Sequence, residues 1–250
     1  MNTKMKVLSL ALLGLVGYAG SAAAGCPGSP VPPWTTLTEL GTGSAFAIVA
    51  GGLDSSACSA TSTLGASVTA AATVTDETPA NEPSYRFQFL IDPDALGPLA
   101  GATESVSVFR ANAAAAANGR INMLTVFLQA GPAGAKRLRF VASCNTPPAF
   151  VCAQSFTTDL PAGVTRVEGR LTTPASTPAA QLDYWVNAAQ GTSEPAASGT
   201  IAALDNGAWV GVKTAIMGMS GPTTPFAAAH GGQAVGFDTF DSRRATYIGW

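Results

Sequence analysis

Short runs in which apolar and polar residues alternate recur along almost the whole chain of 250 residues. In YRFQFLI, residues 85–91, the odd positions are all apolar and the even positions include Arg86 and Gln88. Successive side chains of a β-strand point to opposite faces, so this pattern predicts a strand with one buried face. Further runs of this kind are SAFAIVA, GASVTAAATVT, SVSVFRA, NMLTVFLQA, RLRFVAS, TRVEGRLTT, LDYWVNA, WVGVKTAIMG and AVGFDTFDSRR. Many short strands with turns between them predict an all-β fold, an antiparallel two-sheet β-sandwich or jelly roll.

Two other stretches bear on the connections between the expected strands. The run ANAAAAANGR, residues 111–120, has a helix-like composition but is short and lacks an apolar stripe. A helix of this length is marginal by itself, so we expect a connection between strands. The run LDNGAW, residues 204–209, contains the Asn-Gly pair that is typical of a tight hairpin.

The first 24 residues have the features of a bacterial secretory signal. Lys4 and Lys6 precede the apolar run VLSLALLGLVGYAG and the small-residue stretch SAAAG. We therefore expect a signal peptide over residues 1–24 and a single β-sandwich domain over residues 25–250, exported to the periplasm or the cell exterior. Cys26 lies close to the cleavage point, which leaves lipid modification as an alternative. No later stretch is long and apolar enough to span a bilayer.

The charge of the chain argues against one class of partner. The chain has 13 Lys and Arg against 15 Asp and Glu, and two of the lysines belong to the expected leader. The mature protein would therefore carry 11 cations and 15 acids, a net charge of −4. A nucleic-acid partner has no electrostatic basis in such a chain.

The four cysteines form an even set behind an export signal, which predicts two disulfides. Cys144 and Cys152 lie on either side of the turn NTPPAF, so a Cys144–Cys152 bond would clamp a hairpin. A Cys26–Cys58 bond then follows by elimination. No CxxC spacing is present, which argues against a metal site made of these residues.

Several stretches together resemble the concanavalin A-like lectin/glucanase superfamily, in particular the laminin-G-like jelly rolls of bacterial secreted proteins. They are, in chain order, EPSYRFQFLIDPDAL, TRVEGRLTT, LDYWVNA, LDNGAWVGVKTAIMG and GFDTFDSRRATYIG. The resemblance covers roughly residues 30–250 and implies two curved sheets that can bind glycans, in some members with calcium. Where a Trp-Val-Asp-Gly turn is expected, the chain has Trp185-Val186-Asn187-Ala188 and lacks the carboxylate.

No catalytic arrangement is recognisable in the sequence. The single histidine, His230, has no accompanying GxSxG motif. The Glu-x-Asp-x-x-Glu run of the glucanase members is absent, and Asp238 and Asp241 would lie on opposite faces of a regular strand. The loop acids show no EF-hand spacing, so we expect no cofactor, with calcium as an open alternative.

Candidate ligand-binding residues come from the two runs that contain tryptophan. Alternation places Asp183, Trp185 and Asn187 on the more polar side of one strand and Trp209 on the more polar side of another. Sugar faces stack on aromatic rings beside hydrogen-bonding groups, so these four residues are the predicted glycan site. The alternative is that both tryptophans are packed, because tryptophan is seldom exposed without packing somewhere.

The last stretch, residues 236–250, contains two adjacent arginines, Arg243 and Arg244. Both cannot reach solvent from a regular strand that has one buried face. We expect a strand that ends near Asp241, an irregular step after it and a short closing strand. One arginine should pair with Asp238 or Asp241, because an unpaired buried guanidinium is costly. The segment is therefore predicted to be structural.

Taken together, these features favour a non-catalytic binding module of the envelope or exterior, which recognises a glycan or a protein surface. A glycan hydrolase or lyase of the same superfamily and a structural envelope protein are the alternatives. A glycan-binding protein and an enzyme would differ in whether they turn over a polysaccharide.

Overall fold

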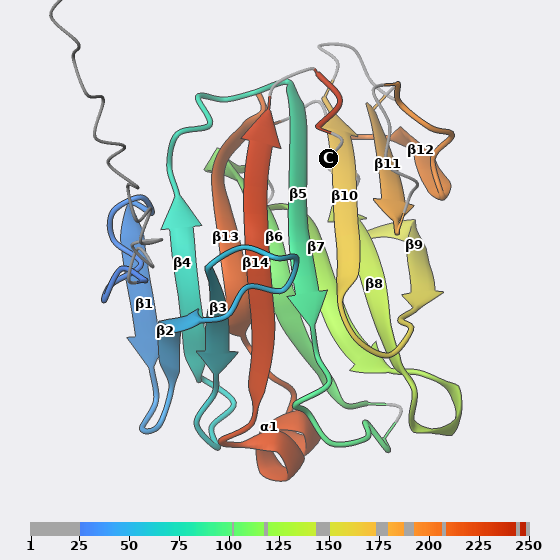
Figure 1. The fold of residues 1–250 in the computed structure, drawn as a ribbon. Helices are drawn as coiled ribbons and strands as arrows, with labels where there is room; N and C mark the ends of the chain where they lie inside the picture. The colour runs from blue at the N-terminus through green and yellow to red at the C-terminus, as the bar shows by residue number, and fades with distance from the viewer. Residues whose placement is uncertain are drawn as a thin grey trace, which may run out of the picture.

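The computed structural model describes residues 26–101, 103–117, 120–143, 151–173, 180–187, 193–206, 209–243 and 246–248. These residues form fourteen β-strands, one α-helix and one 3-10 helix (Figure 1). The strands are β1 Thr36–Leu40, β2 Ala45–Ala50, β3 Cys58–Thr63, β4 Ala71–Asp76, β5 Ser84–Asp92, β6 Ser105–Ala117, β7 Arg120–Ala130, β8 Lys136–Ser143, β9 Val151–Asp159, β10 Thr165–Thr172, β11 Ala180–Val186, β12 Gly199–Leu204, β13 Val212–Ser220 and β14 Ala234–Arg243. The helices are η1 Pro132–Gly134 and α1 Thr224–His230.

The strands form two antiparallel sheets of seven strands each, which confirms the predicted β-sandwich. The front sheet, which faces the viewer in Figure 1, has the order β12-β11-β10-β5-β14-β3-β2. The back sheet has the order β1-β4-β13-β6-β7-β8-β9. Helix α1 lies at one end of the sandwich, where the chain passes from the back sheet to the front sheet (Figure 1).

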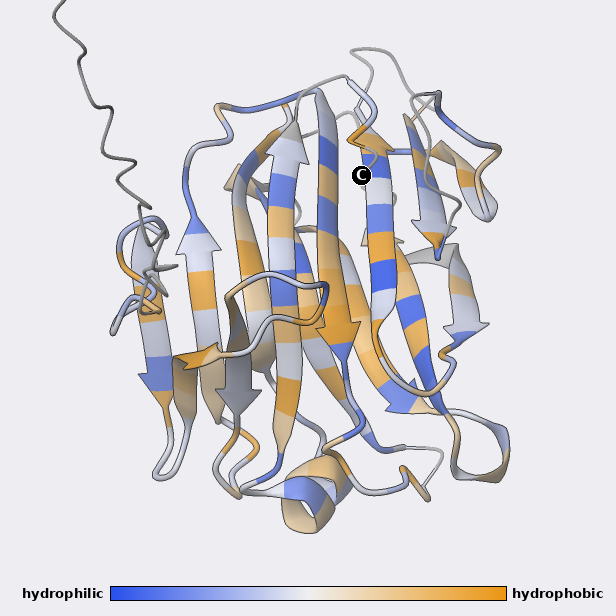
Figure 2. Ribbon diagram, viewed as in Figure 1, coloured by the Kyte–Doolittle hydropathy of each residue, from blue (hydrophilic) through white to orange (hydrophobic). Residues whose placement is uncertain are grey.

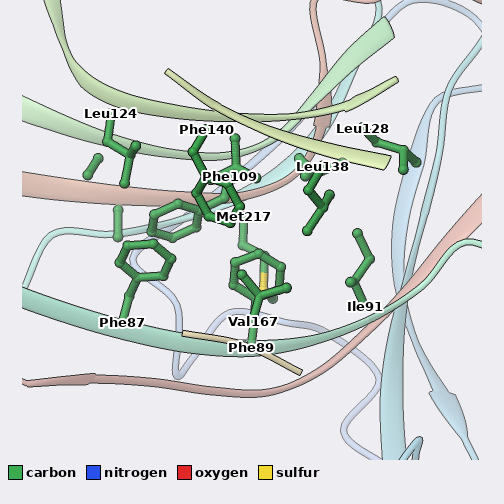
Figure 3. Close-up of a cluster of buried hydrophobic side chains, with 14 of the residues drawn as sticks. Phe87, Phe89, Ile91, Phe109, Leu124, Leu128, Leu138, Phe140, Val167 and Met217 are labelled. Carbon is green, nitrogen blue, oxygen red and sulfur yellow. The ribbon is translucent and has the colours of Figure 1, made fainter. Parts of the chain in front are cut away.

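The core lies between the inner faces of the two sheets. Figure 3 shows Phe87 and Phe89 of β5 facing Phe109 of β6, and the ring centroids of Phe87 and Phe109 are 4.2 Å apart. Phe140 and Met217 of the back sheet complete this cluster. The alternation seen in the sequence is visible along β10 in Figure 2, where hydrophilic and hydrophobic residues follow one another. Burial of the apolar side chains between the two sheets is therefore the main stabilising contribution.

One glycine is needed where the core is tightest. Gly169 of β10 lies directly opposite Phe87 of β5, with its missing side chain on the inner face. A Cβ atom at this position would lie 2.4 Å from the Phe87 ring. The glycine therefore makes room for the phenyl ring, with Glu168 and Arg170 on either side of it on the outer face.

The alanine run is not a connection, which corrects the sequence-based expectation. Strand β6 continues to Ala117 and β7 begins at Arg120. The strand pairs with β13 on one side and β7 on the other, and Ala111 and Ala113 are buried in the core. The helix propensity of alanine amounts to fractions of a kcal/mol per residue, and tertiary pairing of the backbone overrides it.

The Asn-Gly hairpin prediction is wrong. Strand β12 pairs with β11 in the front sheet, whereas β13 lies between β4 and β6 in the back sheet. The segment between β12 and β13 therefore crosses from one sheet to the other. Strand β13 begins only at Val212, so Trp209 precedes the strand. The strand alternation that placed Trp209 on a polar face therefore does not apply to it.

The irregularity predicted near the chain end is present but lies earlier. Strand β14 shifts register against β5 between Asp238 and Asp241, and Thr239 has a φ of 48°. The strand then continues to Arg243 instead of ending near Asp241. Arg244 and the side chain of Arg243 lie outside the described residues, so the predicted pairing of an arginine stays a prediction.

Cys26 and Cys58 form a disulfide, as predicted. This bond indicates an oxidising, extracytoplasmic compartment. Cys144 and the side chain of Cys152 lie outside the described residues, as does the expected signal peptide. Across the described ranges, we find no helix with the length and apolar character that a membrane crossing requires.

Candidate functional site

The outer face of the front sheet contains two of the predicted ligand residues. On β11, Leu182 and Tyr184 point into the core, so Asp183 and Trp185 lie on the opposite face, as the alternation predicts. Both are nevertheless covered by protein, with exposures of 4% for Asp183 and 2% for Trp185. The Trp185 indole donates a hydrogen bond to the carbonyl of Pro195 at 3.0 Å.

Beside Trp185, arginines and carboxylates of three strands form a chain of ion pairs. Arg86 of β5 contacts Glu168 at 2.6 Å and Glu194 at 3.0 Å. Arg170 contacts Glu194 at 3.0 Å and Asp183 at 2.7 Å. Hydrogen bonding from Arg86 lowers the pKa of Glu194 below its ordinary value. Each carboxylate of this cluster is therefore in contact with at least one arginine of the same protein.

The Asp183 carboxylate is fully engaged by its neighbours. Burial would raise the pKa of Asp183, but hydrogen bonds from Thr200, Arg170 and Gln181 outweigh burial and lower it. The Thr200 hydroxyl and the Gln181 amide both donate to Oδ1, at 2.7 and 2.6 Å, while Arg170 binds Oδ2. A sugar hydroxyl could therefore bind this carboxylate only by displacing one of its internal hydrogen bonds.

The chain end covers the same cluster. The Tyr247 ring centroid lies 5.0 Å from the Arg86 guanidinium, on which Trp185 also packs at 4.5 Å. The backbone N–H of Ile248 donates to Glu168 at 3.4 Å. Figure 1 shows the chain end beside β5 and β10 at the front of the molecule. This face is therefore closed by the protein itself.

The other predicted ligand residues do not join Asp183 and Trp185 in a common site. Asn187 is exposed at the end of β11, with a φ of 48°, and its side chain accepts a hydrogen bond from the Arg166 backbone at 2.8 Å. Asparagine tolerates this left-handed conformation better than most residues. Trp209 is 3% exposed and belongs to the core. Ligand contact by these residues stays a prediction, and the structure does not bring them together.

Asp238, one of the two predicted structural acids, anchors a loop. Asp238 accepts hydrogen bonds from the backbone of Leu53 at 2.8 Å and the hydroxyl of Ser56 at 2.7 Å. These residues belong to the connection between β2 and β3, which crosses in front of β14 in Figure 1. In the described ranges, no three His, Cys, Asp or Glu side chains converge on a point where a metal ion could bind.

The outer face of the back sheet differs in charge from the outer face of the front sheet. The 54 residues from Ser105 to Thr158 contain five cations and no acid, and they include all of β6, β7 and β8. These three strands are neighbours in the back sheet. This block contains no recognisable motif, and the absence of acids over its length is the signal in the sequence that could have revealed it.

The pairing of the strands brings two arginines to the centre of this face. Phe109 and Ala111 point into the core, so Arg110 between them points outward, and Arg139 does so between Leu138 and Phe140. The shared outer surface, which we name the arginine face, consists of Ser107, Arg110, Asn112, Thr125, Phe127, Arg139 and Ser220. From strand spacing and rise, the Cα atoms of Arg110 and Arg139 are about 12 Å apart.

Neither central arginine has a carboxylate partner among the described residues. Arg110 donates to the hydroxyl of Ser107 at 3.0 Å and to that of Ser220 at 2.8 Å. Burial lowers the pKa of Arg110, although a guanidinium stays protonated in proteins. The Arg139 guanidinium lies 5.2 Å from the Phe127 ring centroid, and its buried Nε has no described hydrogen-bond partner.

The neighbouring Arg137 behaves differently and provides a comparison. It faces the same side of β8 as Arg139, two residues away, but binds Asp159 of β9 at 2.7 Å. Its charge is therefore matched at the edge of the face. The centre keeps two positive charges, an aromatic ring and several hydroxyl and amide groups, a combination suited to a carboxylate-bearing ligand.

Comparisons with known proteins identify the fold. No protein-family model matches the chain, and no curated protein sequence matches it. Among solved structures, the marine PL-14 alginate lyase from Aplysia kurodai is 10% identical, with a TM-score of 0.60, over 88% of this chain and 97% of that one. An alginate lyase Aly36B variant in complex with alginate trisaccharide is 12% identical, with a TM-score of 0.54, over 75% and 82%.

A third structural match is the cellulose-induced protein Cip1, which is 13% identical with a TM-score of 0.51, over 85% of this chain and 91% of that one. At these identities the likeness shows the fold alone. The chain has the concanavalin A-like jelly-roll fold, which confirms the resemblance seen in the sequence. Its structural neighbours are mostly alginate lyases.

Proposed function

We propose that the protein is an exported, non-catalytic binding module that recognises an acidic polysaccharide on the arginine face. The observation that carries the proposal is the pair Arg110 and Arg139, which have no carboxylate partner among the described residues. A partly buried guanidinium without a counter-charge is costly, and a ligand carboxylate would supply the missing charge. The Cα spacing of about 12 Å exceeds the length of one sugar, so the two guanidinium groups could bind two different carboxylates of one polymer chain.

The chemistry of the structural neighbours supports this class of ligand. Alginate, which the Aly36B variant holds as a trisaccharide, is a chain of uronate sugars that each carry one carboxylate. The rest of the face could also serve such a chain, because Phe127 offers a ring for stacking and Asn112 offers a buried amide oxygen with no described partner.

The arrangement favours binding over cleavage. Removal of a proton from a uronate needs a general base within hydrogen-bond reach. The single histidine, His230, is 4% exposed in α1 and contacts Glu104 at 3.2 Å. Tyr85 and Tyr184 are in the core, and Tyr247 lies over the front sheet. None of these groups belongs to the arginine face.

Titration of the purified protein with sodium alginate and with neutral laminarin tests the proposal. We expect binding to alginate that weakens as salt is added, because salt screens exposed charges, and no measurable binding to laminarin. Arg110→Gln and Arg139→Gln should each weaken binding about tenfold, which corresponds to about 1.4 kcal/mol for a lost charge-assisted hydrogen bond. Thermal unfolding of each variant shows whether the fold is retained.

Arg137→Gln is the matched control. It removes a cation from the same strand and the same side, but one whose charge Asp159 already balances. We expect its affinity for alginate to stay within about twofold of the wild type, because an exposed ion pair contributes little. Equal losses for Arg137→Gln and Arg139→Gln would contradict the proposed site. Release of unsaturated oligosaccharides from alginate would show that the protein is a lyase.

A further inference from the structure

A pocket of about 450 Å³ lies on another part of the molecule, between the N-terminal segment 27–34 and the irregular part of β14. Its apolar wall includes Trp34, Ile48, Met217, Phe237 and Phe240. The ring centroids of Trp34 and Phe240 are 4.7 Å apart. The volume is within the range of small-molecule sites, which are mostly apolar with a few polar groups.

The polar groups of this pocket are acidic. Asp76 of β4 and Asp238 and Asp241 of β14 line it, and its described lining contains no Lys, Arg or His. Asp238 is held in place by hydrogen bonds from Leu53 and Ser56. No ion pair of Asp76 or Asp238 occurs among the described residues. The electrostatic character of the pocket is thus opposite to that of the arginine face.

A buried polar group lies behind Ser242, one of the residues that line the pocket. The Tyr85 hydroxyl adjoins Ser242, and Tyr85 is only 1% exposed. Burial raises the pKa of Tyr85, and the charges of Asp76 and Asp241 raise it further. The phenol therefore stays neutral and adds no charge of its own beside the pocket.

We propose that this pocket binds a small organic cation, an ammonium or guanidinium group attached to an apolar body. The apolar body would lie against Met217 and Phe237, and the cation would lie near Asp76 and Asp238 beside the rings of Trp34 and Phe240. Aromatic faces attract cations, and carboxylates add a direct charge interaction. This inference does not depend on the proposed polysaccharide site.

Calorimetric titration with phenethylamine and with phenylpropionate tests the pocket. The two probes have nearly the same shape and opposite charge, so their comparison in the wild-type protein isolates the electrostatic contribution. We expect phenethylamine to bind at least about tenfold more tightly than phenylpropionate. Equal binding of the two probes, or no binding of phenethylamine, would overturn the proposal.

Asp76→Asn provides the matching variant. An asparagine can still accept the hydrogen bond that Asp76 receives from the backbone of Thr78 at 2.8 Å, so the fold should be retained. Asp94→Asn is the control, because Asp94 likewise accepts one backbone hydrogen bond, from Gly163, and does not line the pocket. Asp76→Asn should weaken phenethylamine binding about tenfold, and Asp94→Asn should leave it unchanged. Equal effects of the two substitutions would contradict the site.

Discussion

At the residue scale, the Arg86–Glu168 pair is the interaction whose loss should cost most stability. Both side chains are almost completely buried, and the ion pair is 2.6 Å long. Glu168→Gln would leave the buried guanidinium with Glu194 as its described carboxylate partner. We expect a loss of about 3 kcal/mol in the free energy of unfolding, because breaking a buried pair leaves an uncompensated charge. Urea denaturation measures this loss.

Glu194→Gln is the control at the same guanidinium. The Glu194 side chain is 32% exposed, so water can replace part of its interaction with Arg86. We expect a loss of about 1 kcal/mol or less for this substitution. Similar losses for the two variants would show that burial of the Arg86–Glu168 pair has no special weight.

Alternation in the sequence correctly predicts which side of a strand a residue faces, but it does not predict what covers that side. Asp183 and Trp185 face away from the core, as the pattern of β11 indicates. Segment 193–198 packs against Trp185 through the hydrogen bond to Pro195, and segment 246–248 packs on the neighbouring Arg86 and Glu168. Such contacts between a strand and irregular segments leave no local periodicity in the sequence.

At the element scale, backbone pairing between strands decides which structure a segment adopts, even where composition or a local motif favours another structure. The alanines of β6 have high helix propensity, yet the strand has partners on both sides and its backbone groups are bonded there. The Asn-Gly pair after β12 suggests a hairpin, but the chain crosses between sheets. These two misreadings arise because propensities of about 1 kcal/mol or less are smaller than the free energy of completing two sheets.

The N-terminal segment 27–34 contains no strand and depends on a covalent bond at its start. The Cys26–Cys58 disulfide closes a loop with a sequence separation of 32 residues. On the chain-entropy relation, a loop of this length contributes up to about 3.7 kcal/mol. We expect the double variant Cys26→Ser, Cys58→Ser to lose most of this free energy in urea denaturation without reductant.

The double variant is preferable to adding a reductant, because Cys144 and Cys152 stay unchanged. The contact between Trp34 and Phe240 should also loosen, which would shift tryptophan fluorescence to longer wavelength. An unchanged urea midpoint together with an unchanged spectrum would show that packing alone holds the segment.

At the scale of the whole molecule, the two outer faces of the sandwich differ in how their charges are paired. On the front outer face, the carboxylates beside Trp185 are paired with arginines, and segments of the same chain cover this cluster. The back outer face has its central cations unmatched by any described carboxylate, although the whole chain has a net negative charge. Charge is thus distributed unevenly over the molecule, as expected of a surface that attracts a ligand of opposite sign.

The fold could be predicted from the sequence because alternation and turn residues are local signals that all strands share. The arginine face could not be predicted in the same way, since it depends on the order of β6, β7 and β8 in the sheet. Arg110 and Arg139 are 29 positions apart in the chain and meet on one face only after β7 has paired with both neighbouring strands. The acid-free block from Ser105 to Thr158 was the available sign that these strands form a surface of positive charge.

The most direct test of the arginine face compares alginate with alginate whose carboxylates have been chemically reduced to alcohols. The two polymers share the same linkages and differ in charge, so the difference in affinity measures recognition of the carboxylate. Our account predicts that reduction weakens binding to the wild-type protein by at least about tenfold and has little effect on the Arg110→Gln, Arg139→Gln double variant. Equal affinity of the wild-type protein for the two polymers would contradict the account.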